Sequence, residues 1–129
     1  MADEGRFAPW VVKGWMDDVE AIDKYLALFA DDPLAGDPLA AEIVGGIYAR
    51  QLSSWTRSSD YALTLAAGVL WRSLVPGTVV RAVGAFDAAF NGNLLFRTLL
   101  VTPVEYPSGG TYPLPAGEYV VGLDVPVTG

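Results

Sequence analysis

The stretch VVRAVGAFDAAFNGNLLFRTLLVTP, residues 79–103, contains two apolar runs separated by a turn-like centre. Apolar side chains in both runs follow the period of two residues that is typical of β-strands. The residues predicted to share a face are Val80, Ala82, Gly84 and Phe86 in the first run, and Leu94, Phe96, Thr98 and Leu100 in the second. Between the runs, the pair Asn91-Gly92 is a strong turn signal because both residues tolerate a positive φ angle. The stretch therefore predicts two buried antiparallel strands joined by a loop.

Asp87 is the only carboxylate in this stretch and lies where the first run ends. Such a group is either a catalytic carboxylate at the mouth of a site or an acceptor for backbone N–H groups of the loop. Asp is common beside turns for the second reason. We therefore predict an architectural role for Asp87.

The rest of the chain also consists of short apolar segments, broken by 14 glycines and nine prolines that are spread along its length. Alternation continues in residues 45–55, 60–68 and 118–125. In the first of these segments, the face predicted for one continuous strand holds Ile47, Ala49, Gln51, Ser53 and Trp55. This pattern favours an all-β fold, a single antiparallel β-sandwich. A chain of 129 residues is long enough for one such core.

The N-terminal third is ambiguous. In residues 15–33, Val19, Ile22, Leu26 and Phe29 recur at helical spacing behind acidic residues suited to a helix start, whereas KYLALFA (24–30) also resembles a buried strand. The prediction is therefore an all-β domain with at most one short helix, near residues 16–24. Residues 1–22 form an N-terminal arm or short helix, and residues 23–129 form the β-sandwich domain.

Composition excludes several classes of function. The chain has no histidine and no cysteine, which removes disulfides, thiolate nucleophiles, the usual zinc sites and histidine acid–base chemistry. A net charge of −7, with only two lysines, disfavours nucleic acid as a partner. No apolar run is long enough for a membrane span, and the first residues lack the pattern of a secretory signal. We expect no nucleic-acid partner, no membrane and a cytoplasmic site of synthesis.

Carboxylate pairs are the remaining option for catalysis. The candidates are Asp17, Asp18, Asp31, Asp32, Asp37 and Asp60. A glycosidase needs two carboxyl groups on either side of a sugar, but these residues all lie beside turn residues and no pattern brings them together. The segment DDPLAGD (31–37) lacks the order of a calcium-binding loop and is predicted to be a solvated turn. We therefore predict no enzyme activity, no catalytic residue, no metal and no cofactor.

Tryptophan and arginine side chains are the candidates for contacts between subunits. Trp10 and Trp15 lie in a segment that we expect to pack on a neighbouring chain, because aromatic side chains supply large buried areas at interfaces. Four arginines in otherwise apolar strands are predicted to form hydrogen bonds across subunits: Arg50, Arg72, Arg81 and Arg97. The tryptophans leave a second possibility open, a glycan-binding module that recognises sugars of the host cell surface.

Four segments resemble a family of small tailed-bacteriophage proteins labelled tail fibre or minor tail proteins. They are YLALFADDP (25–33), EIVGGIYARQ (42–51), GTVVRAVGAFDAAFNGNLLF (77–96) and LPAGEYVVGLDV (114–125). The pieces GG-x-YAR and FDA…GNLLF carry the resemblance most specifically.

This resemblance implies a structural protein of the virion, assembled in the host cytoplasm. Its partners would be other capsid or tail proteins and further copies of itself, with a trimer as the expected closed unit. Two positions remain open, a tail fibre or minor tail protein and a decoration protein on the capsid surface.

Overall fold

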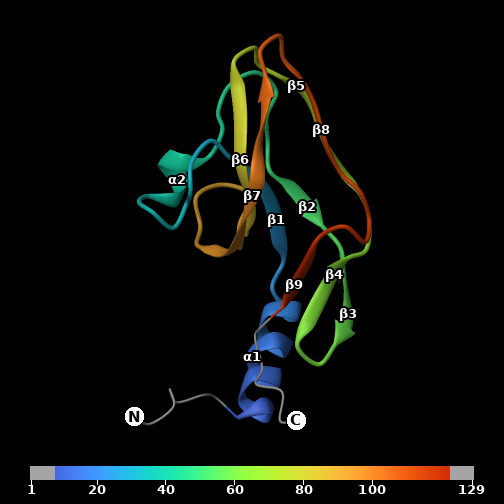
Figure 1. The fold of residues 1–129 in the computed structure, drawn as a ribbon. Coiled ribbons are helices and arrows are strands. Elements are labelled where there is room, and N and C mark those ends of the chain that lie inside the picture. Colours follow the sequence, from blue (N-terminus) through green and yellow to red (C-terminus); the bar gives the residue numbers. More distant parts are fainter. Residues whose placement is uncertain (1–7, 123–129) are drawn as a thin grey trace.

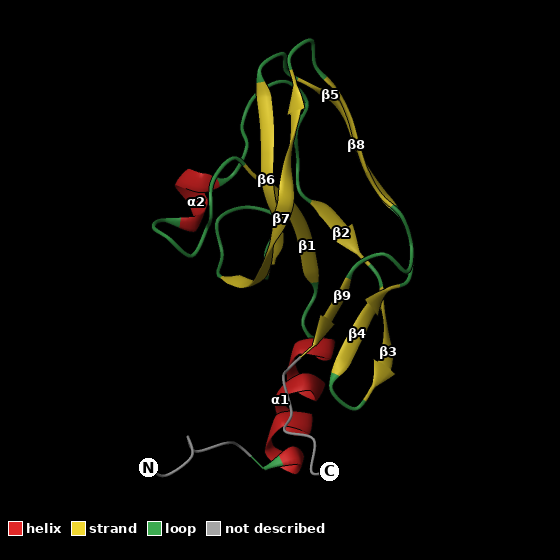
Figure 2. Cartoon of the chain, viewed as in Figure 1, coloured by secondary structure: helices red, strands yellow, loops and turns green. Residues whose placement is uncertain are grey.

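The computed structural model describes residues 8–122, whose strands form three antiparallel sheets (Figures 1 and 2). The largest sheet has the order β2 (Gln51–Ser53), β1 (Lys24–Phe29), β6 (Thr78–Phe86) and β7 (Leu94–Tyr106). A second sheet joins β3 (Trp55–Ser59), β4 (Ala62–Leu65) and β9 (Val120–Gly122), and a third pairs β5 (Val69–Leu74) with β8 (Gly110–Leu114). The predicted all-β, antiparallel fold is confirmed.

The main core lies between the four-stranded sheet and the two smaller sheets. Leu28 and Val83 contribute from one side, and Leu65 and Trp71 from the other. All four are almost completely buried. Because burial of one such aliphatic side chain is worth about 1.5–3 kcal/mol, this packing of sheet on sheet is the main source of stability.

β6 is buried on both faces, and its two faces do not follow the simple alternation predicted from the sequence. Val80 and Val83 belong to the main core, whereas Ala82 and Phe86 pack with Phe29 on the opposite face. The register explains the difference, because Val80 pairs with Val104 while Ala82 already pairs with Leu99. Such a bulge rotates the strand locally. The prediction that Val80 shares a face with Ala82 and Phe86 is therefore wrong.

A second irregularity, between Ala85 and Phe86, has the same effect on β7. Leu94 packs against the Phe29–Phe86 cluster, whereas Phe96 and Leu100 pack against the main core. The shared face predicted for Leu94 with Phe96 and Leu100 is therefore also wrong.

The N-terminal helix begins earlier than predicted. α1 (Pro9–Ala21) projects from the end of the sheets, with proline at a position where a missing N–H is tolerated (Figure 1). It ends at Ile22, where the backbone becomes extended, and the Nζ atom of Lys24 donates to the carbonyls of Glu20 (3.2 Å) and Ile22 (2.7 Å). The next residues are strand β1, so the strand interpretation of KYLALF was the correct one.

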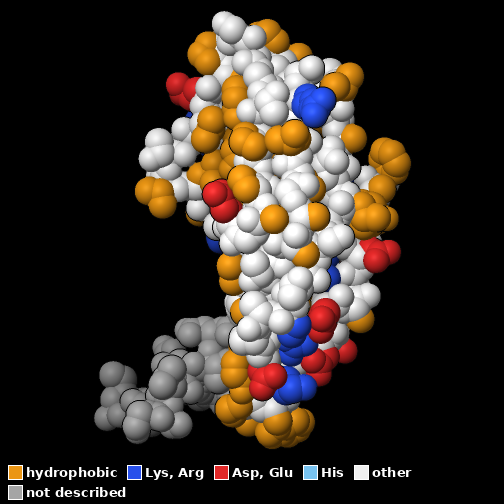
Figure 3. Space-filling model, turned by 90° about the vertical axis from the view of Figure 1, so that its right-hand side faces the viewer, with side chains coloured by type: hydrophobic (Ala, Val, Ile, Leu, Met, Phe, Trp, Pro, Cys, Tyr) orange, Lys and Arg blue, Asp and Glu red, His pale blue; other side chains and the backbone are white. Residues whose placement is uncertain are grey.

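An ion cluster ties α1 to the sheet β3-β4-β9. Nη1 of Arg57, in β3, lies 2.7 Å from Asp17 and 2.8 Å from Glu20. In Figure 3, acidic and basic side chains are interspersed over the lower part of the molecule, next to hydrophobic side chains at its tip. No helix in the described part of the chain is long and apolar enough to cross a membrane.

The segment between β1 and β3 differs most from its prediction. α2 (Pro38–Ala41) follows the predicted turn, with the side chain of Asp37 accepting a hydrogen bond from the N–H of Leu39 at 3.0 Å. The strand predicted over 45–55 is wrong, because Gly45 and Gly46 take φ angles of 107° and 60° and only 51–53 pair as β2. The last part of the alternation predicted for 118–125, from position 123 on, lies outside the described residues.

Candidate functional site

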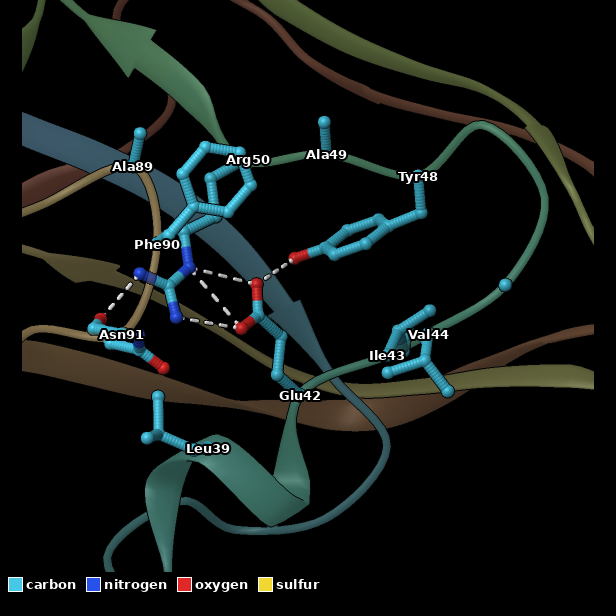
Figure 4. Close-up of a pocket in the computed structure, with 11 residues that line it drawn as sticks. Leu39, Glu42, Ile43, Val44, Tyr48, Ala49, Arg50, Ala89, Phe90 and Asn91 are labelled. Carbon is cyan, nitrogen blue, oxygen red and sulfur yellow. Dashed lines mark hydrogen bonds and ion pairs between the residues drawn. The ribbon is translucent and has the colours of Figure 1, made fainter.

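A hollow of about 470 Å³ opens between α2, the irregular segment 42–50 and the β6–β7 loop (Figure 4). Its rim is apolar and open to solvent, since the residues Phe90 and Val44 are 85% and 78% exposed and Leu39 is 41% exposed. Its floor is polar and is formed by Glu42, Tyr48 and Arg50. The floor determines what chemistry this hollow can support.

A buried ion pair forms the centre of the floor. The Nη2 atom of Arg50 lies 2.9 Å from Oε1 of Glu42, and Nε lies 3.0 Å from Oε2. The two side chains are only 5% and 12% exposed. This is the bidentate geometry, in which a planar guanidinium binds a carboxylate most strongly.

Arg50 also holds the β6–β7 loop. Its Nη1 atom donates to the carbonyl oxygens of Ala88 at 2.8 Å and Asn91 at 2.7 Å, and its guanidinium stacks on the ring of Phe86. One side chain therefore fixes a loop about forty positions away in the sequence to the segment 42–50.

Tyr48 completes the network from the other side. Its hydroxyl donates to Oε2 of Glu42 at 2.7 Å and accepts from the backbone N–H of Leu28, in β1, at 3.0 Å. Burial, followed by the hydrogen bond to Glu42, raises the pKa of Tyr48 far above its usual value. The hydroxyl therefore remains protonated and acts as a fixed link between the loop and the sheet.

Asp87 has the architectural role predicted for it. Its Oδ1 accepts from the backbone N–H of Asn93 at 2.7 Å, and its own N–H donates to the carbonyl of Asn93 at 3.0 Å. The hydrogen bond from the backbone N–H of Asn93 is the largest cause that lowers the pKa of the Asp87 carboxylate. Between these positions Asn91 and Gly92 take φ angles of 53° and 77°, as the turn signal predicted.

The polar atoms of the floor bind one another or the backbone. Both oxygens of Glu42 accept hydrogen bonds, the hydroxyl of Tyr48 donates one and accepts one, and every guanidinium nitrogen of Arg50 donates. Within residues 8–122, no group of three acidic side chains is placed to hold a metal ion. The arrangement fixes two loops and presents an apolar rim to solvent.

Three of the candidate carboxylates have partners within the chain. Asp17 binds Arg57, Asp32 binds Nε of Arg97 at 3.0 Å, and Asp37 caps α2. Each of these three groups has a structural partner of its own.

The structure places the six predicted interface residues in different settings. Trp10 and Trp15 are on α1 and are 77% and 42% exposed. Arg50 and Arg97 bind carboxylates of their own chain. Arg72 and Arg81 are exposed and form no ion pair with any residue between positions 8 and 122.

Glu42 and Tyr48 were missed as site residues by the sequence reasoning. A signal was present, because EIVGGIYAR places an acid and a base on either side of two glycines. Glycines with positive φ angles fold such a segment back on itself, so that its two ends meet.

Comparison with known families agrees with this geometry. The sequence profile described as "Podophage GP4 fiber I protein gp80" matches residues 19–122. The matched region includes all strands from β1 to β9 and the whole Glu42–Tyr48–Arg50 network. No curated protein matches the chain. The chain belongs to the family of the podophage GP4 fiber I protein gp80, which is a family of phage fibre proteins.

Proposed function

We propose that the protein is a non-enzymatic structural subunit of a tailed-phage virion, a fibre-type or minor tail subunit that works by packing against other subunits. The observation that carries this proposal is the family match over residues 19–122. The subunit assembles in the host cytoplasm and is part of the finished particle.

Two exposed apolar surfaces support a role in packing. The rim of the main hollow carries Phe90 and Val44, and α1 carries Trp10 and Trp15. Aromatic side chains are enriched at protein interfaces, and exposed apolar patches of this kind mark contact sites. Other virion proteins and further copies of this chain would cover them, with a trimer as the expected homo-oligomer.

The arginines divide into two groups under this proposal. Arg50 and Arg97 stabilise the subunit itself, since their guanidinium groups bind Glu42 and Asp32. Arg72 and Arg81 are the arginines available for hydrogen bonds across subunits.

A glycan-binding module receives less support. Phe90 offers an exposed ring beside a hollow, but the polar groups of the floor already bind one another. A sugar would find few free donors or acceptors there, although sugar hydroxyl groups need them when they are buried.

Quantitative peptide mass spectrometry of purified virions tests the proposal, with the protein counted against the major capsid protein. We expect a few copies to some tens per particle, as for a tail appendage. A count close to that of the capsid protein would instead make it a capsid-surface decoration protein. Complete absence from the particle would overturn the proposal.

A further inference from the structure

A second hollow, of about 190 Å³, lies on the other side of the segment that borders the main hollow. Tyr48 and Ala49 line both hollows. The second one is completed by Gln51 of β2 and by residues 70–72 of β5. We call it the Arg72 hollow.

Arg72 and Gln51 are the polar side chains of this hollow without a partner. Neither side chain forms a hydrogen bond or ion pair with any residue in the described range 8–122. Most other basic groups in that range are bound to carboxylates or carbonyls of their own chain. These bound residues are Lys13, Lys24, Arg50, Arg57 and Arg97. An unpaired arginine is notable in a chain with 15 acidic and eight basic residues.

The backbone beside Arg72 is irregular. The pairing of β5 with β8 shifts register between Trp71 and Leu74, and Ser73 takes a positive φ angle of 54°. A bulge redirects side chains, and a non-glycine residue at positive φ costs energy that the surrounding structure must compensate. Ser73, the residue that follows Arg72, therefore has a strained backbone conformation.

The walls of the hollow are fixed in place. The indole N–H of Trp71, which is only 2% exposed, donates to the carbonyl of Ala49 at 3.1 Å. This bond joins the β5 wall to the opposite wall. A site with fixed walls loses little conformational entropy when it binds a ligand.

We propose that the Arg72 hollow binds the carboxylate of an aspartate or glutamate on a second copy of this chain. A guanidinium binds a carboxylate through two parallel N–H groups, and the amide of Gln51 can donate a third hydrogen bond. Because acidic residues outnumber basic ones, a second copy presents many carboxylates. This inference rests on the self-association in the proposed function and names the chemistry of one contact in it.

The walls favour a protein as the source of the carboxylate. Ile47 and Leu70 are 71% and 42% exposed beside the hollow, so they form an apolar surround for a charged contact, as at binding hot spots. The ring of Trp71 is buried and cannot stack on a sugar.

Sedimentation equilibrium of the purified full chain tests the inference, with Arg72→Ala compared with Arg72→Lys. Arg72→Lys is the matched variant, because it keeps a positive charge at the same position in the hollow and removes only the planar guanidinium. We expect self-association of the wild type to weaken about tenfold in Arg72→Ala and less than about threefold in Arg72→Lys. Association should also weaken between about 50 and 500 mM NaCl.

The alternatives are distinguishable. If the wild type associates and Arg72→Ala associates as strongly as the wild type does, the inference is overturned while the proposed function remains. If the wild type is monomeric at every concentration, the self-association itself fails, and the inference fails with it. If Arg72→Ala assembles normally but glucuronate shifts the Trp71 indole resonance of the wild type alone, the occupant is an acidic sugar, which overturns the second copy as occupant.

Discussion

The guanidinium carbon of Arg50 lies 3.6 Å from the centre of the Phe86 ring. Arg50 belongs to the segment GGIYARQ, and Phe86 begins the segment FDAAFNGN. The two pieces that carry the family resemblance therefore meet in space, through one stacking contact and two hydrogen bonds to carbonyls. The pieces of this chain that resemble the family therefore meet at a junction between loops.

Replacing Arg50 by alanine should destabilise the protein strongly. The change leaves the buried carboxylate of Glu42 without its cation and frees two loop carbonyls. Removal of one partner from a buried pair costs about 3–5 kcal/mol, so we expect a loss of this size in the free energy of unfolding. Urea denaturation monitored by tryptophan fluorescence measures it.

A double-mutant cycle with Glu42→Gln gives the control for this prediction. If the two side chains act through each other, the double variant should be less unstable than the sum of the single variants. Additive effects would show that Arg50 and Glu42 do not stabilise the protein through their contact with each other. Arg81→Ala, at an exposed position, should change stability by less than about 0.5 kcal/mol.

Asp87 should make stability depend on acid pH. Its N–H bonds hold the carboxylate pKa below the usual value of 3.8. The ionised form therefore favours the folded state above pH 3.8, and this contribution is lost as the pH falls through the lowered pKa. The difference in unfolding free energy between wild type and Asp87→Asn should be constant near neutral pH and shrink below pH 3.8. A difference that is the same at every pH would show that the charge has no part in the loop.

The hairpin around Asp87 was predictable because its signals are local. Alternation of apolar residues specifies strands, and Asn91-Gly92 supplies the two positive φ angles that the turn requires. Likewise, Leu63 and Leu65 alternate with their neighbours in 60–68 and are buried in β4.

The errors arose where distant residues determine local structure. The face of Val80 depends on a bulge in its pairing with β7, and no pattern within β6 announces it. Arg50 lies in a segment with strand-like alternation, but its contacts with Glu42 and the β6–β7 loop keep that segment out of the sheet. Nothing in the sequence indicates which arginines find a partner within the chain.

Substitution by alanine should have opposite effects on stability at Gly14 and at Gly92. Gly14 lies within α1, and a Cβ atom there would meet no atom within 4 Å. Gly14→Ala should therefore stabilise the protein by about 0.5–1 kcal/mol, because glycine is unfavourable in a helix. At Gly92 the φ angle is +77° and a Cβ atom would lie 2.5 Å from Oδ1 of Asp87, so alanine should destabilise. Thermal unfolding of both variants checks the pair, and a stable Gly92→Ala would contradict the loop geometry.

The ionisation of Tyr119 should lower the free energy of unfolding at alkaline pH. Its hydroxyl donates to the carbonyl of Val83 at 3.2 Å and accepts from Thr98 at 3.1 Å, and burial raises its pKa to about 12. Because this pKa lies above the usual value of 10.0, the neutral form favours the folded state. That contribution is complete below pH 10 and is lost between pH 10 and about 12.

Ultraviolet titration of tyrosinate measures the coupling. Tyr119 should ionise late, together with unfolding, and Tyr119→Phe should remove part of the late step. The variant should also lose about 1 kcal/mol of stability at neutral pH, since the carbonyl of Val83 loses its hydroxyl donor. If all six tyrosines ionised in one step near pH 10, the hydroxyl of Tyr119 would be accessible to solvent. Such a result would contradict the packing of this region. Tyr119 directly precedes strand β9 and is buried beside Val83 of β6, so an accessible hydroxyl would mean that β9 does not cover the core there.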